Sequence, residues 1–146
     1  MEILEIITLL QTFCANRGWH FIYGVNQFER NLQTIREYLP DELVLIADFR
    51  VDPTYQNNKI TKVRYTCLFM LGRKSEYCNT ANLDESNQQK YDRRIKDLIE
   101  AFTVGVIAFA CENELDIISA PITVGLNVYD ENIDFVISES VIFEES

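Results

Sequence analysis

Two apolar segments decide the fold of this chain: ELVLIADFRV at residues 42–51 and ITKVRYTCLFML at residues 60–71. Both are rich in β-branched and aromatic residues, which favours extended strands. Between them lie Pro53 and the run Gln56-Asn57-Asn58, which are residues typical of turns. The pattern predicts one long β-hairpin. Because the second strand is apolar on both faces in its far half, we expect the sheet to be covered on both sides there.

Helical periodicity precedes the hairpin. Residues 2–16 place apolar side chains at helical spacing, and Gly18 is a typical helix terminator. The segment 19–24 is aromatic and β-branched, which predicts a short strand. Apolar residues within 28–39 step by three and four positions, which predicts a short helix that ends at Pro40.

A long helix is predicted at residues 84–112, after a loop at 72–83. Asp84 is a suitable N-cap residue for it. Its apolar stripe steps by three and four positions and consists of Tyr91, Ile95, Leu98, Phe102, Val106 and Phe109. The second half of the helix, AFTVGVIAFA, is apolar all round, so we expect it to be buried across the sheet. Gly105 would allow a close crossing there.

The C-terminal part predicts two more strands. Residues 115–126 form one of them, and Pro121 within it predicts a sheet edge or a bulge at that point. A turn at 130–132 precedes the last strand at 133–143. The sequence therefore predicts a single α+β domain spanning residues 1–146. Its mostly antiparallel sheet, with the long β-hairpin, packs against the N-terminal helix and the long central helix.

Composition narrows the possible functions. The net charge of -10 excludes nucleic-acid binding by counterion release over the whole surface and disfavours anionic membranes. The four cysteines form no CxxC pair, so a zinc site is not predicted. Cys14, Cys67 and Cys111 lie in apolar runs and are expected to be small core residues in a reducing cytoplasm. The start at Met1 lacks the basic region of a signal peptide, and the longest apolar run, 102–111, is too short to span a bilayer.

No sequence motif predicts chemistry. His20 is the only histidine and lies between two aromatic residues, which is typical of a packing position in a strand. The acidic cluster Asp130, Glu131 and Asp134 lacks the spacing of a calcium loop and is typical of a solvated turn. The glycines are isolated, so no phosphate-binding loop is predicted. We therefore expect no catalytic, cofactor-binding or metal-binding residues, although a pair of carboxylates among the 23 acids stays possible.

Charge is unevenly distributed along the chain. Nine of the 13 Lys and Arg residues lie within 59–96, whereas residues 112–146 hold nine acids and no Lys or Arg. If these segments occupy opposite sides of the domain, they favour head-to-tail contacts, which close into rings. Replacing Arg93 and Arg94 by Glu is then expected to weaken assembly more at low salt than at high salt. The alternative is that the basic group Lys90, Arg93, Arg94 and Lys96 is only a solvated, mixed-charge helix face.

The order of elements resembles the tail-terminator and tail-completion proteins of tailed bacteriophages, a group that includes head–tail connector ring proteins. The resemblance rests on the first helix ending at 15–18, the hairpin 42–71, the amphipathic helix 84–112 and the stretch Asn127-Val128-Tyr129-Asp130-Glu131-Asn132-Ile133-Asp134. That stretch is similar to an ending found in small tail proteins of phages with Bacteroides-like hosts. The resemblance as a whole covers most of the chain but includes no residue with a chemical role. Two departures are the segment 25–40 and the last strand, which could instead be an arm that pairs with a neighbour's sheet edge.

The resemblance implies a structural virion protein that is not an enzyme and has no cofactor. It would form a ring of itself, a hexamer or dodecamer, against neighbouring portal, connector or tail-tube proteins. DNA would pass through the ring without specific binding, and no membrane would be involved. The hairpin and the loop 72–83 would be the interaction elements. Two alternatives stay open: a small bacterial protein-binding or adaptor module, and an enzyme that uses carboxylates.

Overall fold

A six-stranded mixed sheet forms the centre of the protein. In the computed structural model, residues 2–24, 28–74, 86–125 and 133–145 are described. The strand order is β1-β2-β3-β6-β4, with β5 beside β6. Among the described strands only β1 and β2 pair in parallel, so the predicted α+β class with a mostly antiparallel sheet is confirmed. The strands are β1 (His20–Tyr23), β2 (Val44–Gln56), β3 (Lys59–Lys74), β4 (Leu115–Ser119), β5 (Thr123–Gly125) and β6 (Ile133–Glu145).

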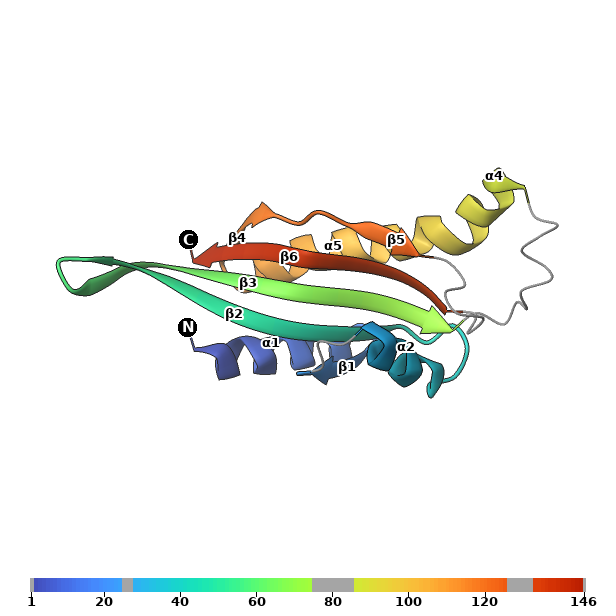
Figure 1. Cartoon of the computed structure of the whole chain (residues 1–146), viewed down its shortest axis with the longest axis horizontal. Helices are drawn as coiled ribbons and strands as arrows, with labels where there is room; N and C mark the ends of the chain where they lie inside the picture. Colours follow the sequence, from blue (N-terminus) through green and yellow to red (C-terminus); the bar gives the residue numbers. More distant parts are fainter. Residues whose placement is uncertain (1, 25–27, 75–85, 126–132, 146) are drawn as a thin grey trace.

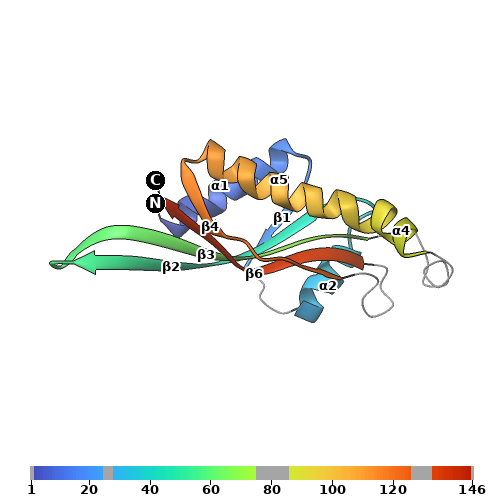
Figure 2. The same cartoon turned by 90° about the horizontal axis from the view of Figure 1, so that it is seen from above.

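Helices cover the two faces of the sheet unequally (Figures 1 and 2). The helices α1 (Ile3–Asn16) and α5 (Lys96–Glu112) lie on one face, which we call the α5 face. The shorter α2 (Phe28–Arg36) lies on the other, the α2 face. The short α4 (Asn87–Lys90) and a π-helical turn, η1 (Tyr91–Ile95), lead directly into α5. Each face has its own apolar core, and the α5-face core is the larger.

The strands of the hairpin extend further than predicted toward the turn and at the end of β3, although β2 begins at Val44 rather than at residue 42. β2 continues through Pro53 to Gln56, and the turn itself is only Asn57-Asn58. Both asparagines have positive φ angles, 53° and 62°, as a two-residue type I′ turn requires. Pro53 is tolerated within the strand because β1 pairs with β2 only as far as Ala47, so no ladder needs its missing N–H. β3 likewise extends to Lys74, so the predicted loop was wrong for residues 72–74.

Gly72 explains how α2 packs against the sheet. A Cβ atom at this position would lie 2.7 Å from Cδ1 of Ile35 and 3.3 Å from the carbonyl oxygen of Asp134. Ile35 is fully buried in the α2-face core. Glycine in β3 therefore makes room for α2, which lies within the segment 28–39 where a short helix was predicted.

The long helix begins later than predicted and is less buried. Ser86 is its N-cap and forms a capping box with Gln89, whereas Asp84 lies outside the described residues. In α5, Leu98, Phe102, Val106 and Phe109 face the sheet as predicted, but Tyr91 is 45% exposed because the π-helical turn changes the phase of the helix.

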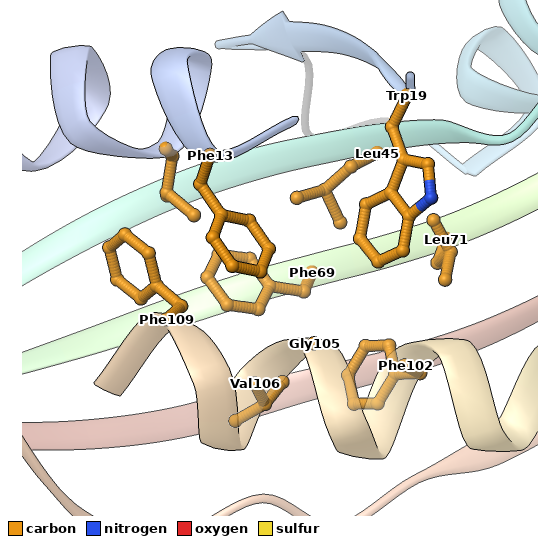
Figure 3. A pocket seen from close by; sticks show the side chains of 10 residues that line it. Phe13, Trp19, Leu45, Phe69, Leu71, Phe102, Gly105, Val106 and Phe109 are labelled. Atoms are coloured by element: carbon orange, nitrogen blue, oxygen red, sulfur yellow. The ribbon is translucent and has the colours of Figure 1, made fainter. Parts of the chain in front are cut away.

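Only one side of α5 is covered. Val104 and Ile107 are each 55% exposed, so the expectation that the second half is wholly buried was wrong. The sheet can cover a single face of a helix, and no second layer of described residues lies outside α5 (Figure 2). Gly105 allows a close approach to the Trp19 side chain rather than to the strands, since a Cβ there would lie 2.9 Å from the indole (Figure 3).

The last strand occupies the inside of the sheet. β6 pairs with β3 on one side and with β4 and β5 on the other. The alternative that it is an arm reaching a neighbouring subunit is therefore wrong. The predicted strand 115–126 is two strands, β4 and β5, with Pro121 between them at the sheet's edge, as proline's missing donor requires.

Candidate assembly surfaces

The most prominent feature of the surface is the end of the β2–β3 hairpin, residues 53–62, which we call the arm tip. Figures 1 and 2 show it projecting beyond the rest of the molecule, past both ends of the chain. Every residue from 54 to 62 is exposed. Two of them are large and apolar: Tyr55 is 65% exposed and Ile60 57%. The tip therefore presents apolar side chains that its own body does not cover.

The hairpin, which we call the arm where it leaves the sheet, is held to β6 by contacts of Lys62, Arg64 and Tyr65. Lys62 Nζ lies 2.6 Å from Glu144 Oε1, and Arg64 Nε donates to Glu144 Oε2 at 2.8 Å. Hydrogen bonds from Lys62 and Arg64 hold the pKa of the Glu144 carboxyl below its ordinary value. One step along, the Tyr65 hydroxyl donates to Glu145 Oε1 at 2.6 Å. These contacts fix the direction in which the arm leaves the sheet.

The Glu144 contacts predict a pH dependence of stability. Because its folded pKa is lowered, its contribution is complete above the unfolded pKa, near 4.5, and is lost as pH falls through the folded value. We expect Glu144→Gln to lower the free energy of unfolding at pH 7 and to flatten its decline below about pH 4.5. Urea unfolding at a series of pH values measures both. Glu139→Gln, an exposed position on the same strand, is the matched control, and an equal flattening in it would contradict the assignment.

A second exposed surface is the outer edge of the sheet beyond β6. We call β4 (Leu115–Ser119), together with the end of α5 and the turn that precede it (residues 112–114), the β4 edge. Ile117 is 36% exposed and Ile118 47%, and Ile122 beyond the strand is 36% exposed. The edge also carries the exposed acids Glu112, Glu114 and Asp116. Among the described residues, β4 has a strand partner on one side only.

The α2 face is hollowed where α2 does not cover it. One hollow of about 500 Å³ is lined by Pro121, Thr123, Phe135, Ile137, Glu139 and Ser140. Another of about 200 Å³ is lined by Asp48, Phe49, Arg50, Thr66, Leu68 and Glu139. Glu139 belongs to both, so they are neighbours on one face of β6. Their mixed apolar and polar lining suits contact with a protein surface.

The basic and acidic segments of the chain lie side by side rather than on opposite sides. From Arg64 to Lys74, β3 of the basic segment pairs with the acidic β6. Several charges are consequently neutralised within the chain, as in the Glu144 contacts. The expectation of a positive flank opposite a negative flank is therefore wrong for β3 and β6.

Arg94 and Asp134 form a buried ion pair, with side chains 2% and 1% exposed. Arg94 Nε donates to Asp134 Oδ2 at 3.0 Å, and Nη2 donates to Oδ1, so the guanidinium binds the carboxylate through two atoms. Arg73 Nη2 donates to the Arg94 carbonyl at 3.2 Å. The interpretations of a solvated helix face and a solvated turn were thus wrong for these two residues. The side chain of Arg93, and Asp130 and Glu131, lie outside what the structure describes.

The buried pair also changes how assembly should be tested. Glu at position 94 would face Asp134 in the interior, so it would destabilise the fold before it could report on a surface. Lys59 is the better site for charge reversal, because it is exposed at the arm tip.

His20 has a packing role, as its neighbours in sequence indicate. Its Nε2 lies 2.6 Å from Glu42 Oε2, and its ring stacks on Tyr38 with centroids 4.2 Å apart. These contacts join the start of β1 to the chain before β2. In the parts of the chain that the structure describes, no three His, Cys, Asp or Glu residues gather as a metal site.

The cysteine prediction holds in part. Cys14 and Cys67 are buried, and burial raises the pKa of the Cys14 thiol to about 12. Burial likewise raises the pKa of Cys67. Both are poor nucleophiles in this state. Cys111 is exposed on the outer side of α5, so its prediction as a core residue was wrong.

A small cavity of about 20 Å³ lies in the apolar core on the α5 face (Figure 3). Phe13, Trp19, Phe102 and Phe109 are among the apolar residues around it, and Gly105 faces Trp19 there. The volume is about that of one water molecule, and the lining offers no polar partner, so this space is a packing void.

Comparison with known proteins does not assign the chain to a family. No family model matches the sequence, and no curated protein matches it. Among the described residues, no helix is long and apolar enough to cross a membrane. Of the exposed surfaces, the arm tip, the β4 edge and the hollowed α2 face are the candidates for contact with other proteins.

Proposed function

We propose that this protein is a structural virion protein of the phage head–tail junction or tail. It forms an oligomeric ring that continues the DNA channel between portal and tail. The arm supports this proposal: the hairpin extends beyond the rest of the molecule (Figure 1), and its residues Tyr55 and Ile60 are 65% and 57% exposed. Exposed apolar groups on a rigid extension are typical of protein–protein contacts.

In this proposal the protein works through contacts and without catalysis. Its partners are further copies of the chain, in a hexamer or dodecamer, together with neighbouring portal, connector or tail-tube proteins. The ring assembles in the host cytoplasm and is part of the finished virion. DNA passes through it without specific binding, which the net charge of -10 favours because like charges repel.

The test is to measure the mass of the protein in solution before and after the arm is shortened. We expect light scattering coupled to size-exclusion chromatography to give a hexamer or dodecamer at high concentration, and negative-stain images to show rings. In the shortened variant, Asn-Gly replaces residues 55–61, which preserves the pairing of Thr54 with Lys62. We expect this variant to be monomeric with a nearly unchanged melting temperature, because the residues removed are exposed.

Two results would count against the ring. One is a full-length protein that stays monomeric at the highest concentration tested. The other is a shortened variant that assembles as well as the full-length chain, since the arm would then be irrelevant to assembly.

A second candidate is a small protein-binding or adaptor module. The hollows on the α2 face favour it, because they offer a mixed apolar and polar surface of the kind that receives another protein. A monomer whose arm tolerates shortening, but which binds a partner through a surface that Glu139→Arg disrupts, would support this function over the ring.

A further inference from the structure

The arm tip and the β4 edge both expose large apolar side chains. Tyr55 and Ile60 are exposed at the tip, and Ile117 and Ile118 are exposed at the edge. The tip cannot reach the edge of its own molecule, since β6 lies between β3 and β4 in the sheet. Only another molecule can bring the two surfaces together.

The two surfaces also carry opposite charge. The arm tip holds Lys59 and Lys62 and no acid, in a chain whose net charge is -10. The β4 edge holds Glu112, Glu114 and Asp116 and no Lys or Arg. Lys62 is engaged with Glu144, so Lys59 is the charge placed furthest along β3 toward the turn. Opposite charges on two exposed surfaces favour their contact and fix its orientation.

Each of the two surfaces includes the edge of a β-strand. The ladder between β3 and β6 stops at Arg64 and Glu144, so β3 has no β6 partner over residues 59–63. The outer edge of β2 is less suitable, because Pro53 removes a backbone donor there. β4 has one strand neighbour among the described residues. Strand edges of this kind pair readily with a strand from another chain.

We infer that the arm tip of one copy adds, through the edge of β3, to the β4 edge of the next copy. This inference rests on the ring-forming function proposed above and names the two surfaces that join. The contact is heterologous, because tip and edge are different parts of the chain. Repeated around an axis, such contacts close into a ring or continue as a filament.

Cross-linking between two different variants tests the contact. In a background with the exposed Cys111 and the fourth cysteine of the sequence, Cys78, replaced by serine, one variant carries Ile60→Cys and the other Ile118→Cys. A short bismaleimide should join them in an equal mixture, with a dimer yield at least about tenfold above either variant alone. Ile60→Cys mixed with Val104→Cys, which is 55% exposed on α5, is the matched control.

Charge reversal gives an independent readout on the same assay. We expect Lys59→Glu to reduce the cross-linked yield about tenfold at low salt and much less at high salt. Asp116→Lys in the partner variant should restore the yield. Lys96→Glu, which makes the same change at an exposed position on α5, should leave it unaltered.

The outcomes separate this inference from the proposed function. Oligomers that form without tip-to-edge cross-links, or with equal yields in the control mixture, overturn the contact but leave the ring. A chain that is monomeric in light scattering overturns both.

Discussion

Replacing Arg94 by alanine should cost about 3–5 kcal/mol of the free energy of unfolding, because Asp134 would be left as a buried charge without its guanidinium. A domain of this size has a total stability of about 5–15 kcal/mol, so the loss is a large fraction of it. Each kcal/mol corresponds to roughly 2–4 °C, which predicts a melting temperature lower by about 10 °C. Urea unfolding followed by circular dichroism measures the change. Lys96→Ala, at an exposed position two residues along, should cost less than about 0.5 kcal/mol.

The double replacement Arg94→Met with Asp134→Leu separates burial of a lone charge from loss of the pair. Two apolar side chains of similar volume avoid the desolvation cost of both ions, so the double variant should recover most of the stability lost by Arg94→Ala. If Arg94→Ala lowered the free energy of unfolding by less than about 1 kcal/mol, the ion pair would not be the main attachment of η1 to β6.

The hairpin could be predicted because its signals are local. β-Branched and aromatic residues favour strands, and Asn57-Asn58 favours a tight turn, whatever the rest of the chain does. Its exact length could not be predicted, since Pro53 is acceptable only where the neighbouring strand ends. That neighbour, β1, has only four residues, and it pairs in parallel with β2 no further than Ala47.

The buried ion pair could not be predicted, because its partners are 40 residues apart in sequence. One signal was available: Asp134 alternates with Ile133 and Phe135 in a strongly apolar strand, which is unusual for a solvated turn. Arg94 gave no such signal, since its place depends on the π-helical turn. The candidate surfaces were predicted in part. The arm follows from the hairpin, but the exposure of the β4 edge follows from β6 lying inside the sheet.

The exposed side of α5 shows the limit of periodicity arguments. AFTVGVIAFA contains apolar residues all round, which is typical of a helix buried on every side. The structure buries one side only, with Val106 covered and Val104 exposed. Apolar composition thus identifies a helix that can be buried, but the number of layers in the fold determines how much of the helix is buried.

Phe109 should be the most costly apolar residue of the core to truncate. It is 1% exposed and makes edge-to-face contacts with Phe13 and Phe143, each with ring centroids 5.7 Å apart. Phe109→Ala removes these contacts and enlarges the existing cavity of about 20 Å³. We expect a loss of about 3–5 kcal/mol, measured by urea unfolding.

The same helix supplies the control. Val104→Ala, at a position 55% exposed, should change stability by less than about 0.5 kcal/mol. A cycle of Phe13→Leu and Phe109→Leu, alone and together, isolates the ring–ring interaction, for which we expect about 0.5–1.5 kcal/mol of coupling. If Phe109→Ala cost less than about 1.5 kcal/mol, the aromatic chain from α1 through α5 to β6 would not be what holds the helices on the sheet.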